Sequence, residues 1–253
     1  MPDPRAPRLA VLIDADNIPA RHIEAVLDEI AEHGEPSVRR VYGDWSSSAL
    51  TQWKEKARSL GLVMHQQSAN TKGKNASDIG LVIDAMDILH AGKFDGFVLV
   101  SSDSDFTRLA SRIREEGLEV VGIGEAKTPE SLRKVCNRFI LIENIIEDGE
   151  PAAEAKPHPA RTSGDAAAQP ERAKTPKEPA SNAIPLIIAA MRAIDPDGEW
   201  YSMGQIGQYI TQGAPDFDTR TYGAAKLSDL TKKLSRFEVK PGPGGQLLVR
   251  DKA

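Results

Sequence analysis

Short apolar runs alternate with helical patterns along the first 147 residues, and this alternation restricts the possible folds more than any other feature. The runs that predict strands lie at residues 9–13, 38–42, 62–65, 97–102, 119–123 and 139–142. Between them, apolar residues recur at helical spacing, and Pro or Gly marks several helix ends. Strands that alternate with helices form a mainly parallel sheet covered by helices. The sequence therefore predicts an α/β fold for residues 1–147.

The run at residues 97–100 is the most informative of these strands because it leads directly into acids. Four consecutive apolar residues are typical of a strand buried on both faces, and Asp103 and Asp105 follow it. The strand at residues 9–13 likewise ends at Asp14. Open α/β sheets bind ligands at the carboxyl ends of strands, so these acids converge if the two strands are neighbours. The simpler interpretation is that Asp103 and Asp105 only cap the next helix. One acid would suffice for a cap, so the presence of two needs a further reason.

A third acid stands where a predicted helix begins. Asp78 precedes residues 79–89, which are apolar almost all round and are expected to be largely buried. A carboxylate is costly to bury there unless it is paired or binds a cation, although the helix dipole alone also favours an acid. The predicted oxygen ligands are Asp14, Asn17, Asp78, Asp103 and Asp105. Oxygen-only ligands suit Mg²⁺ or Mn²⁺, which can activate water for attack on a phosphodiester.

The loop before Asp78 carries Lys72 and Lys74, which are candidates to hold flanking phosphates; the alternative is an ordinary solvated loop. Other chemistries lack their signatures, because no Gly-Lys-Ser/Thr phosphate loop and no Cys/His zinc spacing occurs. The single Cys136 excludes an intramolecular disulfide. The net charge of −5 does not decide whether nucleic acid is bound, since clustered acids in a metal-dependent nuclease give the same balance.

Composition changes at residues 148–181, where Pro, Ala, Lys and Glu dominate and large apolar residues are almost absent. Such a segment buries too little apolar surface to offset the entropy of folding, so we predict a disordered linker. Folding signals return in residues 182–253. Helices are predicted at residues 184–194, 203–210 and 219–236, and a hairpin is predicted from residues 237–240 and 246–250. Three helices followed by a hairpin indicate a small winged-helix domain.

Three motifs in the first domain resemble the NYN family of PIN-like ribonucleases. They are Leu-Ile-Asp-Ala-Asp-Asn at residues 12–17, Lys-Asn-Ala-Ser-Asp-Ile-Gly-Leu-Val-Ile-Asp at 74–84 and Val-Ser-Ser-Asp-Ser-Asp-Phe at 100–106. The resemblance covers roughly residues 8–144. It implies a PIN-like, Rossmannoid sheet and a metal-dependent endoribonuclease. It also implies that the catalytic and metal-binding acids are Asp14, Asp78, Asp103 and Asp105, with Asn17 as an accessory ligand. Asp84 matches an acidic position of the family's helix, but no role follows for it.

The last domain resembles the OST-HTH or LOTUS winged-helix modules. The resemblance lies in the apolar first helix, the Gly-Glu-Trp turn at residues 198–200, the run at 222–230 and the closing hairpin. Such modules are associated with RNA binding, and some bind proteins. Lys226, Lys232 and Lys233 are therefore candidate RNA-binding residues, with an ordinary solvated helix face as the alternative.

These observations predict an Mg²⁺- or Mn²⁺-dependent endoribonuclease tethered by a linker to an RNA-binding module. RNA, single-stranded or structured, is the expected partner, and a protein partner of the last domain stays open. The main rival is a non-catalytic RNA-binding regulator, and a protein-interaction adaptor is the third hypothesis. The acid set favours the nuclease, because a surface that only binds a polyanion gains nothing from clustered carboxylates. We expect a cytoplasmic protein, since neither a signal-peptide pattern nor a membrane-spanning apolar run occurs.

Overall fold

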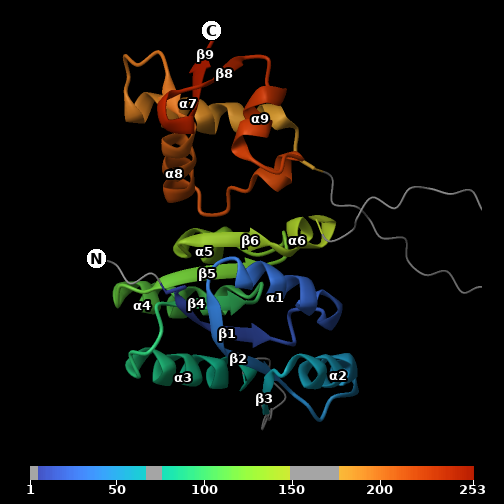
Figure 1. The fold of residues 1–253 in the computed structure, drawn as a ribbon. Coiled ribbons are helices and arrows are strands. Elements are labelled where there is room, and N and C mark those ends of the chain that lie inside the picture. The colour runs from blue at the N-terminus through green and yellow to red at the C-terminus, as the bar shows by residue number, and fades with distance from the viewer. Residues whose placement is uncertain (1–4, 67–75, 149–176) are drawn as a thin grey trace, which may run out of the picture.

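The computed structural model describes residues 5–66, 76–148 and 177–253, which form two domains (Figure 1). The N-terminal domain contains a six-stranded sheet with the order β3-β2-β1-β4-β5-β6, in which every neighbouring pair is parallel. Its strands are β1 (Arg8–Asp14), β2 (Glu35–Gly43), β3 (Val63–Gln66), β4 (Gly96–Val100), β5 (Glu119–Gly124) and β6 (Arg138–Leu141). The predicted α/β fold with a parallel sheet is confirmed.

Helices cover both faces of this sheet. One face packs against α1 (Ile23–Ala31), α2 (Thr51–Leu60) and α6 (Ile142–Asp148). The other face packs against α3 (Ala76–His90), α4 (Thr107–Glu115) and α5 (Glu130–Val135). Side chains of β1 alternate between the two apolar clusters, with Val11 and Ile13 in one and Ala10 and Leu12 in the other. The central strands are therefore buried on both sides, as their continuous apolar runs predict.

Two expectations about the helices of this domain are wrong. Helix α3 was expected to be largely buried, but Ile79 and Ile83 are 59% and 57% exposed. Only its opposite side, with Leu81 and Ala85, packs on the sheet, because the domain has a single helical layer on that face. The apolar run at the end of the domain was predicted as a strand alone, whereas β6 ends at Leu141 and its continuation is α6.

The C-terminal domain combines helices with a small antiparallel sheet. Its helices are α7 (Ile184–Ile194), α8 (Met203–Gly213) and α9 (Leu227–Lys233), and its sheet has the order β7-β9-β8. The strands are β7 (Tyr201–Ser202), β8 (Phe237–Pro241) and β9 (Leu247–Asp251). The predicted third helix at residues 219–236 is in fact divided. A 3₁₀ helix, Thr219–Tyr222, ends at Gly223 with a positive φ of 70°, and α9 begins after it.

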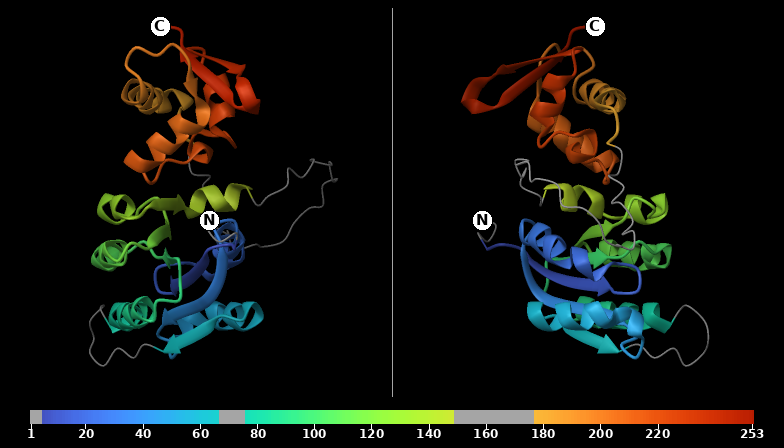
Figure 2. Two further views of the ribbon diagram at one scale, coloured as in Figure 1. Left: turned by 60° about the vertical axis from the view of Figure 1, so that its left-hand side comes forward. Right: turned by 90° about the vertical axis from the view of Figure 1, so that its right-hand side faces the viewer.

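The two domains lie against each other along the β6 edge of the sheet, which all the views show (Figures 1 and 2). The Phe139 amide of β6 donates a hydrogen bond to the Pro215 carbonyl of the C-terminal domain, at 2.9 Å. Most of the predicted linker, residues 149–176, lies outside the described residues. Within the described ranges, no helix is long and apolar enough to span a membrane.

Candidate active site at the carboxyl ends of β1 and β4

The strands β1 and β4 are neighbours, which is the condition for the acids at their ends to converge, and the strand order reverses between them. From β1 the chain continues to β2 and β3 on one side, whereas β4 is followed by β5 and β6 on the other. Ile13 pairs with Val100, so Asp14 and the segment that begins at Ser101 leave the sheet side by side. Open parallel sheets place their ligands at this reversal point, where the flanking loops diverge.

Asp14 is the most deeply buried acid of this region, with 2% of its surface exposed. Its Oδ2 accepts hydrogen bonds from Asn17 Nδ2 at 2.6 Å and Ser101 Oγ at 2.8 Å. Its Oδ1 accepts from the Asp16 amide at 3.1 Å. All three donors are neutral, and no Lys, Arg or His of the described residues forms an ion pair with Asp14. Burial raises the pKa of this carboxyl, although the hydrogen bonds from Asn17 and Ser101 oppose the rise.

Asp103 is connected to Asp14 through the hydroxyl group of Ser101. The Asp103 amide donates to Ser101 Oγ at 3.1 Å, and that same hydroxyl donates to Asp14. Asp103 also caps the 3₁₀ helix Ser104–Phe106, since its Oδ1 accepts from the Asp105 amide at 3.0 Å. The capping role that a single acid would satisfy therefore falls to Asp103 and uses one of its two oxygens. Asp105 is exposed at the start of the same turn.

Of the remaining predicted site residues, the structure describes Asn17 in full, the backbone alone of Asp78, and neither Lys72 nor Lys74. The backbone of Asp78 lies in the first turn of α3, and α3 packs near the 3₁₀ helix that Asp103 caps. Its side chain lies outside the described residues, as do Lys72 and Lys74. The side-chain amide nitrogen of Asn17 donates a hydrogen bond to Asp14, so the amide oxygen of Asn17 is left as an acceptor.

A polar network beside Asp14 was missed by the sequence analysis, which singled out only Asp84. Tyr42 of β2 pairs in register with Asp14, and its hydroxyl donates to Asp84 Oδ2 on α3 at 2.7 Å. Arg40 Nη1 and His65 Nδ1 approach the same oxygen at 2.8 and 3.2 Å. Burial, followed by the bond to Asp84, raises the pKa of Tyr42, so the phenol stays a donor. The network joins α3 to β2 and β3 beside the candidate site.

The oxygen atoms at the candidate site are of the kind that a hard divalent cation binds. Within residues 5–66, 76–148 and 177–253, no three His, Cys, Asp or Glu side chains form a group that could hold a metal. Asp14 and Asp103 nevertheless supply carboxylate oxygens and Asn17 an amide oxygen, which are the ligands that Mg²⁺ and Mn²⁺ prefer. A buried carboxylate that lacks a cationic partner also fits a site for a cation.

The candidate RNA-binding lysines of the C-terminal domain lie on α9 or, for Lys226, directly before it. Lys226 and Lys232 are exposed, and neither forms an ion pair with another described residue. Lys233 instead donates to the carbonyl of Gly223. On the nearby hairpin, Lys240 Nζ lies 3.6 Å from the ring centre of Trp200. The basic side chains of this domain are thus partly engaged in their own packing.

The comparison with family models decides the classification. Residues 8–143 match the NYN domain, and residues 174–249 match the OST-HTH/LOTUS domain. The chain belongs to the NYN family. Both predicted resemblances are confirmed, so the acids around Asp14 lie in a PIN-like nuclease domain that is followed by an OST-HTH/LOTUS domain.

Solved structures with similar chains add little to this classification. A protein of unknown function from Vibrio parahaemolyticus is 21% identical; the match covers 56% of this chain and 96% of that one, with a TM-score of 0.48. An uncharacterized protein from Nitrosomonas europaea is 28% identical; the match covers 41% and 93%, with a TM-score of 0.24. No curated protein matches the chain significantly. The classification therefore rests on the family models.

Proposed function

We propose that this protein is a metal-dependent endoribonuclease with an RNA-binding OST-HTH domain. The observation that supports the proposal most is Asp14, a buried carboxylate with a raised pKa and, within the described residues, no cationic partner, in a PIN-like nuclease domain. Removing a charge from water is costly unless an opposite charge compensates it. A bound divalent cation would compensate it, and the four acids Asp14, Asp78, Asp103 and Asp105 would hold that cation with Asn17.

The residues of the chain prepare this site in distinct ways. Asn17 and Ser101 fix the carboxylate of Asp14, and Ser101 also fixes the backbone at Asp103. When bound, Mg²⁺ or Mn²⁺ supplies an activated water and offsets charge at the phosphodiester. Hydrolysis of this kind leaves a 5′-phosphate and a 3′-hydroxyl. In this proposal Lys72 and Lys74 hold the RNA backbone beside the site, and Lys226, Lys232 and Lys233 bind RNA in the second domain.

Cleavage of labelled RNA by the full chain tests the proposal. Single-stranded and structured RNA are incubated with Mg²⁺, Mn²⁺ or EDTA, and the wild type is compared with Asp103→Asn. Asn removes the charge but is an equally good helix cap, so the variant keeps the hydrogen bond to the Asp105 amide. Asp87→Asn is the matched control, because Asp87 is an exposed acid on α3 away from the sheet. Metal-dependent cleavage that is lost only in the folded Asp103→Asn variant is the expected result.

A non-catalytic RNA-binding protein is the second candidate. It is favoured by the role of Asp103 as a helix cap and by the exposure of Asp105, since both acids then have purely local functions. The same experiment separates the two candidates. RNA binding without cleavage in any metal, and equal in wild type and Asp103→Asn, would overturn the nuclease proposal.

A further inference from the structure

One short segment of the C-terminal domain, residues 215–222 between α8 and α9, forms hydrogen bonds and ion pairs with the NYN domain. Four hydrogen-bonded contacts join it to four elements of the NYN domain. They are Phe139 N to Pro215 O (2.9 Å), Arg133 Nη1 to Asp216 Oδ2 (3.0 Å), Arg220 to Glu29 (2.8 and 3.1 Å) and Asn144 Nδ2 to Thr221 Oγ1 (2.9 Å). We call this set the interdomain contact. Its partners on the NYN domain lie on β6 and on three helices, α1, α5 and α6.

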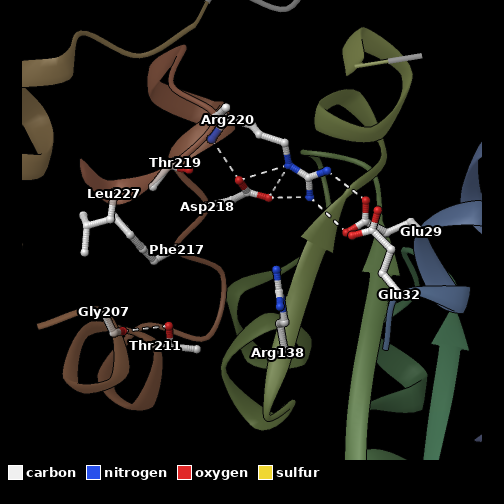
Figure 3. Close-up of a pocket in the computed structure, with 11 residues that line it drawn as sticks. Glu29, Glu32, Arg138, Gly207, Thr211, Phe217, Asp218, Thr219, Arg220 and Leu227 are labelled. Carbon is white, nitrogen blue, oxygen red and sulfur yellow. Dashed lines mark hydrogen bonds and ion pairs between the residues drawn. The ribbon is translucent and has the colours of Figure 1, made fainter. Parts of the chain in front are cut away.

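Arg220 is the centre of the interdomain contact. Its guanidinium lies between Asp218 of its own domain and Glu29 at the end of α1 (Figure 3). Arg220 is 17% exposed and Glu29 is 9% exposed, so this ion pair is largely removed from solvent. Two nitrogens of Arg220 contact both oxygens of Glu29, the bidentate geometry that gives the strongest and most directional pairs. Such a pair requires the two domains to keep one orientation.

The protonation equilibria of this pair agree with its geometry. His33, whose Nε2 lies 3.6 Å from Glu29 Oε1, and Arg220 together lower the pKa of Glu29 to about 2, against the opposing effect of burial. Burial alone would lower the pKa of Arg220, but its hydrogen bonds to Glu29 and Asp218 raise it. Both groups therefore stay charged at neutral pH, and the contact between the domains is a pair of opposite charges.

The backbone of β6 supplies a second, independent contact. β6 is an edge strand of the six-stranded sheet, and edge strands present unpaired amides to other chains. Phe139 pairs with Gly122 of β5 on one side, and on the other side its amide is taken by Pro215. The C-terminal domain thus protects the edge at which the sheet of the NYN domain would otherwise be open.

The faces of α8 and α9 that turn toward the NYN domain are not fully packed. A cleft of about 430 Å³ separates them from it, with Gly207, Thr211 and Leu227 on one wall and Glu32 and Arg138 on the other. Figure 3 shows Arg138 pointing from β6 into this cleft, beneath the ion pair of Arg220. The hairpin of β8 and β9, with Trp200 beside it, takes no part in the interdomain contact.

We infer that the OST-HTH domain of this chain is a protein-binding module whose partner is its own NYN domain, docked through residues 215–222. The two domains then move as one body rather than as modules that tumble independently. The hairpin of β8 and β9 and the exposed lysines Lys226 and Lys232 stay available for another ligand. This inference does not depend on nuclease activity.

A charge exchange across the contact tests the inference in the full chain. Arg220→Glu places a third acid beside Asp218 and Glu29, and Glu29→Arg places two arginines together. The double variant Glu29→Arg/Arg220→Glu restores an opposite-charge pair across the contact, with the arginine now on α1 and the glutamate beside Asp218. Spin labels on new cysteines at Glu55 and Ser235, both exposed, report the distance between the domains. Cys136 does not interfere, because it is buried and burial raises the pKa of its thiol to about 12.

The expected result is a narrow distance distribution in the wild type, a broad one in each single variant, and a narrow one again in the double variant. Arg112→Glu is the matched control, because the ion pairs of Arg112 with described residues are to Glu115 of α4 and the adjoining Glu116, so the reversal should leave the distance unchanged. Asp216→Ala provides a second site, should a charge reversal prevent folding. A broad distribution in the wild type, or narrow distributions in all variants, would overturn the inference.

Discussion

Asp14 and Glu29 are two buried carboxylates of the same domain, 2% and 9% exposed, and their environments differ in one respect. Glu29 lies beside His33 and contacts the guanidinium of Arg220, and these two cationic neighbours, His33 first, lower its pKa to about 2. In the part of the chain that the structure describes, Asp14 contacts neutral donors alone, and burial raises its pKa. Two buried carboxylates thus have pKa values shifted in opposite directions, and the difference follows the presence or absence of a cationic neighbour among the described residues. Glu29 joins two domains, whereas Asp14 is left with a charge that an external cation can compensate.

The largest expected effect is the loss of nuclease activity in Asp14→Asn. The substitution removes the charge that is proposed to hold the metal but preserves the shape of the side chain. We expect cleavage to fall by at least about 100-fold, while the free energy of unfolding without metal changes by less than about 1 kcal/mol. Wild-type protein should gain thermal stability on addition of Mn²⁺, and Asp14→Asn should not. Equal stabilisation of both proteins by Mn²⁺ would contradict the assignment of Asp14 as a ligand.

Arg220→Ala should have the largest effect on stability, because it leaves Glu29 and Asp218 without their shared cation. Breaking one partner of a buried pair costs about 3 kcal/mol. Urea denaturation followed at two wavelengths would measure the loss and show whether the domains then unfold separately. Arg112→Ala, which breaks an exposed pair within one helix, should cost less than about 0.5 kcal/mol. If Arg220→Ala and Arg112→Ala lowered the free energy of unfolding by similar amounts, the pair of Glu29 would be no stronger than an ordinary surface ion pair.

The two carboxylates should also respond oppositely to pH. Glu29 has a lowered pKa in the folded state, so its contribution to stability is present above its ordinary pKa of 4.5 and is lost as the pH falls toward 2. Asp14 has a raised pKa, so protonation favours the folded state and its contribution increases as the pH falls through that raised value. Unfolding free energies of wild type, Glu29→Gln and Asp14→Asn, measured against pH in EDTA, would show these differences. If the unfolding free energies of Glu29→Gln and Asp14→Asn depended on pH in the same way, the opposite pKa shifts of Glu29 and Asp14 would be contradicted.

The sequence predicts the Asp14 region well because its signals are local. An apolar run ends at Asp14 and another ends before Asp103, and parallel strands bring such ends to one edge of the sheet. The connection through Ser101 was not predicted, since a serine after a strand is too common to indicate a bond to a carboxylate on the neighbouring strand. The fold and the place of the candidate site in it therefore follow from periodicity, but the hydrogen bonds that orient Asp14 do not.

The Glu29 region illustrates what periodicity leaves out. Glu29 and Arg220 are 191 residues apart, and each looks like an ordinary charged residue in its own segment. The same is true of Tyr42 and Asp84, which are 42 residues apart. Composition also overstated the burial of α3, because an apolar side chain such as Ile79 does not reveal whether another element covers it. Contacts between distant elements depend on how complete surfaces fit, which a local pattern does not encode.

The smallest expected effect, and the finest test of the contrast, comes from Arg220→Lys. Lys keeps the positive charge but presents one ammonium group, whereas the arginine fork contacts Glu29 and Asp218 at once. We expect a loss of about 1 kcal/mol in unfolding free energy, measured by urea denaturation, with Arg112→Lys as a control that changes almost nothing. A loss as large as that of Arg220→Ala would mean that geometry stabilises the pair. No loss at all would mean that a positive charge near Glu29, without the geometry of the arginine, accounts for the difference between Glu29 and Asp14. Any cation close to Asp14 would then compensate its charge equally well.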